Sequence, residues 1–146
     1  MAETPNLQAA AAALTGRLPR HTFKIPADKY DTGKDGQKIL VYKSPRELDT
    51  DPSEVTLRQL TFEEEQSSLT ASRVKNVDVS YEGAMRAVVA ADGKPVTWEN
   101  DGKEAFFRGL SAQVRDLIVQ AFQSISIPKR VMAEDFLASE KIETTS

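Results

Sequence analysis

The sequence has no cysteine and a single histidine, His21, among its 146 residues. Without cysteine there can be no disulfide bonds, thiolate nucleophiles or thiolate-bound metals, and a reducing compartment is the natural setting. One histidine excludes metal sites built from several imidazoles and leaves little for acid–base chemistry near neutral pH. The composition therefore points away from an enzyme, and we expect no cofactor, no metal and no catalytic residues.

Long apolar runs are also absent. The longest strictly apolar stretch, residues 9–14, has six residues, whereas a membrane-spanning helix needs about 20. Glu3 and Pro5 stand where a secretory signal would carry basic residues. We therefore expect neither a secretory signal nor a membrane partner.

No excess of charge of one sign is present. Nineteen basic and 22 acidic residues give a net charge of −3, and both signs are spread evenly along the chain. Nucleic-acid-binding proteins usually concentrate lysine and arginine in a patch or stripe. Nucleic acid is therefore not an expected partner.

The apolar content is enough for one hydrophobic core. Residues of the apolar set make up 40% of the chain, which is slightly low for a globular domain. We predict a flexible, alanine-rich N-terminal arm over residues 1–20, because Pro5, Gly16 and Pro19 interrupt its short helical segment. One α+β domain should follow over residues 21–126, and residues 127–146 should form a C-terminal helix with a frayed tail.

The first half of that domain, residues 21–61, has the pattern of a small sheet. Alternating or β-branched segments at residues 21–26, 37–43 and 55–61 predict three short strands. Two polar loops, residues 27–36 and 46–54, separate them, and Asp35-Gly36 is a turn signal. These segments predict a small antiparallel sheet of two to three strands packed on a helical bundle.

The second half, residues 62–126, has helix start signals in regular order. Thr61 and Glu64 form a capping box, Ser80 precedes an apolar stripe through Val89, and Asp101 with Glu104 suggests a second box. Ser111 begins the strongest amphipathic segment, which continues to Ile125. With the C-terminal helix, these signals predict four to five short helices.

One segment has two interpretations. Asp92-Gly93 lies between two apolar runs, which is a strong hairpin signal, and Pro95 would then be restricted to an edge strand. The stripe that begins at Tyr81 favours instead a helix that continues through Val89 and is followed by a turn. We expect the helix.

The acidic and glycine-rich loops lack the spacing of known sites. The aspartates of residues 28–35 and 49–54 do not match a calcium-binding loop, which needs a glycine and a distal glutamate at fixed positions. Residues 32–38 lack the phosphate-loop spacing. We expect solvated loops at both places.

A partner-binding element is expected on the C-terminal helix. The aromatic residues of the helical half are needed for the core, whereas four apolar residues near the C-terminus have no evident partner within the chain. An apolar stripe beside charged residues is typical of helix-in-groove binding or self-association, and packing back on the preceding helix is an equal alternative. The candidate partner-binding residues are Val131, Met132, Phe136 and Leu137.

The order of features in the second half resembles the tail assembly chaperones of long-tailed bacteriophages. Residues 55–61 run directly into an acidic helix start at 62–65, and residues 81–96 resemble a helix that leads into an Asp-Gly-Lys-Pro-Val turn. Residues 106–111 precede the helix at 114–122, and residues 125–128 resemble its usual end.

This resemblance implies a non-enzymatic protein of the host bacterial cytoplasm. Such chaperones bind the tape-measure protein, keep it soluble and help to recruit the tail-tube protein, and self-association is a further possibility. The physics is compatible, because a long helical partner needs its apolar stripes shielded. The alternative function is a structural minor virion protein, such as a tail, neck or baseplate adaptor that stays in the particle.

Overall fold

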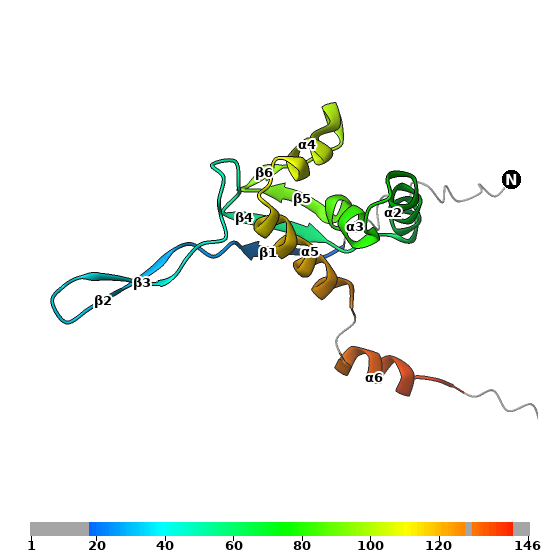
Figure 1. Ribbon diagram of the computed structural model, residues 1–146. Helices are drawn as coiled ribbons and strands as arrows, with labels where there is room; N and C mark the ends of the chain where they lie inside the picture. The colour runs from blue at the N-terminus through cyan, green and yellow to red at the C-terminus, as the bar shows by residue number, and fades with distance from the viewer. Residues whose placement is uncertain (1–17, 128–129, 142–146) are drawn as a thin grey trace, which may run out of the picture.

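The computed structural model describes residues 18–127 and 130–141. The predicted N-terminal arm therefore lies outside the described residues up to position 17, as does the end of the C-terminal tail from position 142. Figure 1 shows the elements in chain order. They are β1 (Arg20–Lys24), β2 (Lys29–Thr32), β3 (Lys38–Tyr42), β4 (Glu54–Arg58), α2 (Phe62–Lys75), α3 (Val79–Ala87), β5 (Val88–Ala91), β6 (Lys94–Pro95), the 3₁₀ turn η1 (Glu99–Asp101), α4 (Gly102–Arg108), α5 (Ala112–Ser126) and α6 (Arg130–Ala138).

The predicted α+β class is confirmed, but the strands pair differently from the prediction. A four-stranded sheet has the order β1-β4-β5-β6, and β2 and β3 form a separate two-stranded hairpin. Strands β5 and β6 come from the half that we predicted to be helical throughout. Strand β3 pairs with β2, which lies in the predicted polar loop 27–36. The Asp35-Gly36 signal thus marks a true hairpin turn, with Gly36 at a φ of 73°.

Strand β4 lies at the centre of the larger sheet. It pairs antiparallel with β1, where Val55 lies opposite Phe23, and with β5, where Val55 lies opposite Ala91. Val55 and Leu57 are buried, while the Thr56 hydroxyl lies 3.0 Å from that of Thr22 on the other face. This alternation gives the sheet one face for the core.

The junction between α3 and β5 corrects the predicted helix. The helix ends at Ala87, and Val88 adopts an extended conformation with φ −67° and ψ 121°. Asp92 and Gly93 have φ values of 50° and 76°, as a tight hairpin turn requires. The β-branched pair Val88-Val89 gains more from pairing with β4 than from continuing the helix. Pro95 lies on the edge strand β6, as the hairpin interpretation demanded.

Helix α5 supplies much of the hydrophobic core. The Ser111 side chain caps it as predicted, because its hydroxyl accepts a hydrogen bond from the Val114 amide at 3.4 Å. Val114, Ile118 and Ile125 are buried, and α5 lies across the sheet in Figure 1. The buried apolar residues form one cluster that joins the sheet, α3, α4 and α5: Ile25, Val55, Leu57, Ala84, Met85, Ala87, Val88, Phe107, Leu110, Val114, Ile118 and Ile125.

The predicted caps of the other helices are partly right. The capping box of Thr61 and Glu64 is present at the start of α2. The Glu64 carboxylate also accepts two hydrogen bonds of 2.8 Å from the Arg58 guanidinium. Asp78, not Ser80, caps α3, since its carboxylate accepts from the Ser80 amide at 2.7 Å. Asp101 makes no side-chain cap, because it adopts a left-handed conformation.

Asp51 is a buried clasp, which corrects the prediction of a solvated loop. One carboxylate oxygen accepts hydrogen bonds from the amides of Glu47 and Leu48, at 2.9 and 3.0 Å. The other accepts from the Ser111 amide at 2.8 Å. The polar loop before β4 is thereby fixed to the start of α5. Burial alone would raise the pKa of Asp51, but these hydrogen bonds outweigh it and lower the pKa below its ordinary value of 3.8.

Replacing Asp51 by alanine should lower the free energy of unfolding by about 2–3 kcal/mol at pH 7, because the amide partners lose their acceptor. A carboxylate with a lowered folded-state pKa stabilises the fold above its unfolded pKa, and this contribution is lost as the pH falls through the folded pKa. The difference between wild type and Asp51→Ala, measured by urea unfolding, should therefore shrink below about pH 4. The exposed neighbour Asp49 provides the control, and an Asp49→Ala variant as unstable as Asp51→Ala would contradict the clasp.

Candidate functional site

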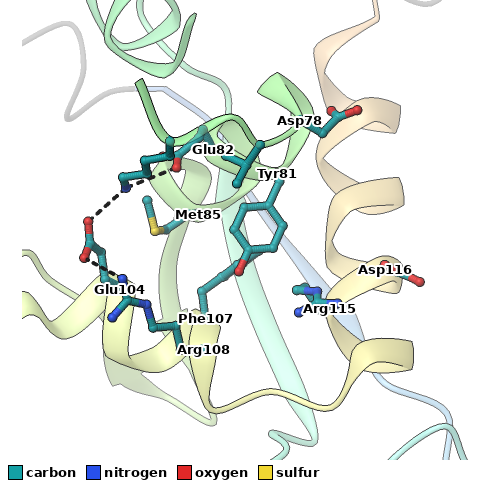
Figure 2. Close-up of a pocket in the computed structure, with 11 residues that line it drawn as sticks. Asp78, Tyr81, Glu82, Met85, Glu104, Phe107, Arg108, Arg115 and Asp116 are labelled. Atoms are coloured by element: carbon teal, nitrogen blue, oxygen red, sulfur yellow. Dashed lines mark hydrogen bonds and ion pairs between the residues drawn. The ribbon is translucent and has the colours of Figure 1, made fainter. Parts of the chain in front are cut away.

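A cleft of about 450 Å³ lies between α3, α4 and α5. Figure 2 shows its side chains, with Tyr81 and Met85 from α3, Phe107 from α4 and Arg115 from α5. The rings of Tyr81 and Phe107 meet edge to face, with centroids 4.9 Å apart. Tyr81, Met85 and Phe107 thus provide an apolar lining, while charged side chains occupy the rim.

A lysine bridges two carboxylates on one side of the cleft. The Lys75 ammonium, at the end of α2, lies 3.1 Å from Glu82 on α3 and 3.1 Å from Glu104 on α4. The Glu82 carboxylate is buried and also pairs with Arg86 at 2.8 Å. Because these groups come from α2, α3 and α4, the ion pairs join three helices.

The charge states of Lys75 and Glu104 suit ion pairs with a structural role. The hydrogen bond to Glu82 is the main reason that the pKa of Lys75 is raised. The hydrogen bond from Lys75 is the main reason that the pKa of Glu104 is lowered. Both shifts favour the charged forms, so Lys75 and Glu104 stay ionised near neutral pH. A general acid would instead need a raised carboxyl pKa.

Two arginines lie on different sides of the cleft. The Arg115 guanidinium lies over the Tyr81 ring at 5.5 Å, and Arg108 is largely exposed and lies 3.8 Å from Glu104. Asp78 and Asp116 line the same cleft, so its charged side chains have both signs.

Trp98 lies between two cations, which corrects the prediction that it belongs to the core. The ring is about half exposed, with Arg86 at 5.5 Å and the Lys103 ammonium at 5.4 Å. Lys103 itself is buried and donates to the Arg86 carbonyl at 2.7 Å. Burial, with the nearby positive charges of Arg58 and Arg86, lowers the pKa of Lys103 to about 8.

The β2–β3 hairpin exposes apolar side chains on both faces. Because directly paired residues share a face, Tyr30 and Leu40 lie on one side of the hairpin, and Ile39 lies on the other. Five of its large apolar residues are between 39% and 59% exposed: Tyr30, Ile39, Leu40, Val41 and Tyr42. Figure 1 shows the hairpin extending away from the helices and from the larger sheet. Such a surface is typical of a protein–protein contact.

Helix α6 carries the residues that the sequence singled out for partner binding. Met132, Phe136 and Leu137 are 63%, 75% and 69% exposed. Val131 belongs to the same helix, but its side chain lies outside the described residues. The structure thus places three of the four candidates together on one accessible helix.

Several other features of the sequence have structural roles. Within residues 18–127 and 130–141, no three histidine, aspartate or glutamate side chains gather in a way that could hold a metal ion. Asp28 accepts a hydrogen bond from the Ser44 amide and holds the base of the hairpin together. None of the helices in the described part of the chain is long and apolar enough to cross a membrane.

Sequence reasoning missed the hairpin surface because the run at residues 37–43 has the composition of a buried strand. The available signal was Asp35-Gly36, which lies between residues 29–32 and 38–42 and marks a hairpin. A two-stranded hairpin has no layer of its own to cover its faces. Recognising that pairing would have predicted apolar residues open to solvent.

Replacing Lys103 by methionine should change how stability depends on pH. The lowered pKa means that the unfolded chain binds the Lys103 proton more strongly between pH 8 and 10.5, so raising the pH in that range favours the folded protein. The free energy of unfolding of wild type should rise by about 1–2 kcal/mol relative to Lys103→Met between pH 8 and 10. If the free energy of unfolding, measured in urea, depends on pH in the same way for wild type and Lys103→Met, the lowered pKa of Lys103 is contradicted.

Comparisons with protein-family models, with curated proteins and with solved structures found no match for this chain.

Proposed function

We propose that this protein is a non-enzymatic tail assembly chaperone of a long-tailed bacteriophage, which acts in the host cytoplasm. It binds the tape-measure protein, keeps it soluble and assists assembly of the tail-tube protein. The observation that carries this proposal is the β2–β3 hairpin, whose five large apolar residues are open to solvent on both faces. The order of capping and turn motifs in residues 55–128 agrees with it.

The hairpin is suited to a helical partner with apolar stripes. Tyr30 and Leu40 are directly paired and give one face aromatic and aliphatic area, and aromatic rings bind well at low conformational cost. Ile39 and Val41 occupy the other face. A partner helix can lay its stripe on either face without a specific pocket. This mode fits a chaperone that contacts many similar segments of one long chain.

Charged residues around the hairpin keep this contact reversible. Lys29 lies at the base of the hairpin, Lys38 lies beside its turn, and Asp31 lies opposite Ile39. Lysines near an open strand edge oppose uncontrolled edge-to-edge pairing. Exposed ionic contacts contribute little net affinity, so the binding strength rests on the apolar residues.

The charged cleft is compatible with a protein that does no chemistry. Its acidic side chains Glu82 and Glu104 are paired with Lys75, and the hydrogen bond from Lys75 lowers the pKa of Glu104. These pairs join α2, α3 and α4. A binding function therefore accounts for the cleft and for the hairpin together.

The double variant Leu40→Lys/Val41→Lys should lose binding to the tape-measure protein. Two charges on opposite faces of the hairpin make its burial costly, and we expect at least a tenfold loss of affinity. The measurement is the soluble fraction of the tape-measure protein on co-expression, with pull-down of the complex. The matched control is Phe62→Lys/Val74→Lys, which changes two residues of α2 that are 76% and 80% exposed.

Two outcomes would contradict the proposal. Wild-type protein that leaves the tape-measure protein insoluble and forms no complex would remove the chaperone function. Equal loss in the two double variants would remove the hairpin as the binding site. Mass spectrometry of purified virions separates the alternative, because a structural tail, neck or baseplate adaptor stays in the particle and a chaperone does not.

A further inference from the structure

An apolar groove of about 200 Å³ lies between β1 and α5. Phe23, Ile25 and Pro26 form one wall, and Leu117 and Ala121 of α5 form the other. An apolar cavity of roughly 150 Å³ is enough to hold a benzene ring. The groove therefore has the size and the chemistry for one aromatic side chain.

Helix α6 carries such a side chain on an apolar face. Met132, Ala133, Phe136 and Leu137 recur at the spacing that places them on one side of a helix. Phe136 is the only aromatic residue of α6 and is 75% exposed. An exposed phenylalanine flanked by methionine and leucine is a typical anchor for a groove.

The charges of the groove and of the helix are complementary. Lys24 is the only charged residue among those that line the groove. The charged residues nearest Phe136 are the acidic Glu134 and Asp135, while Arg130 and Lys141 stand at the two ends of the segment. When Phe136 occupies the groove, the adjacent Asp135 can approach Lys24. Attraction of this kind orients the docked helix.

We infer that α6 docks in the β1–α5 groove of a second copy of this chain. Figure 1 shows α6 beyond the C-terminal end of α5 rather than folded back along it. The groove and the apolar face of α6 are therefore both exposed in one copy. In a pair of copies, each α6 can fill the groove of the other. The reciprocal exchange is isologous and closes at two copies.

The area of contact also favours reciprocal exchange. Stable interfaces bury about 1,200–2,000 Å² in total, and α6 has nine residues, a length of about 14 Å. The exchange uses two helices and two grooves, so it doubles the buried area. The groove and α6 share no residue with the β2–β3 hairpin, so this inference does not rest on the proposed function.

Cross-linking of single-cysteine copies gives a direct test. The chain has no cysteine, so Ala121→Cys in the groove and Ala133→Cys on α6 each create one thiol. A tagged Ala121→Cys copy is mixed with an untagged Ala133→Cys copy and treated with a short bismaleimide. We expect a covalent heterodimer that joins the two different chains and whose peptide map connects positions 121 and 133.

The double variant Ala121→Cys/Ala133→Cys identifies docking within one chain. If this variant forms an internal cross-link while the mixture forms no heterodimer, α6 binds its own groove and the proposal is overturned. A full-length wild-type protein that sediments as a monomer at all concentrations also overturns it. A concentration-dependent monomer–dimer equilibrium together with the heterodimer supports it.

Substitutions then test the contact itself. Phe136→Asp should raise the dimer dissociation constant at least tenfold, whereas Phe62→Asp, the same change at an equally exposed phenylalanine of α2, should leave it unchanged. Lys24→Glu should weaken the dimer, and adding Asp135→Lys should restore it. Circular dichroism checks that each variant is folded. Failure of Phe136→Asp to weaken the dimer would exclude α6 from the interface.

Discussion

The packing of α5 against the sheet is the contact on which the rest of the structure depends. Val114 and Ile118 of this helix share the core with Val55 and Leu57 of β4. Because the chain has only enough apolar residues for one core, this layer carries most of the hydrophobic stabilisation. The Asp51 clasp fixes the start of α5 and sets its position over the strands. Moving α5 would open both the core and the cleft.

Ion pairs hold helix α2 in place, because it has few buried apolar residues. Helix α2 has one buried residue, Ser68, and its C-terminal end is held by the pairs of Lys75 with Glu82 and Glu104. A buried carboxylate such as Glu82 is costly unless it is paired, and Arg86 provides a second partner. These pairs specify how the helices meet more than they stabilise the fold. The arrangement leaves apolar side chains available for the hairpin and for α6.

Much of the fold could be predicted from local signals. The cap at Ser111, the capping box at Thr61 and the apolar face of α5 depend on neighbouring residues, and all three are present. Pairing between distant strands could not be read in the same way. Val88 and Val89 fit a helix stripe equally well, and only the open edge of β4 decides for a strand. The roles of Asp51 and of the hairpin likewise depend on which segments meet in space.

The short outer strands of the sheet limit how the protein can associate. Strand β6 has two residues and contains Pro95, which lacks the amide hydrogen needed to extend the ladder. Strand β1, at the other edge, has five residues between Pro19 and Pro26. Pro95 therefore limits strand addition at the β6 edge, and the two prolines around β1 limit the length of strand that can pair at the other edge. These edges of the larger sheet thereby give little template for the strand-to-strand stacking of a fibre.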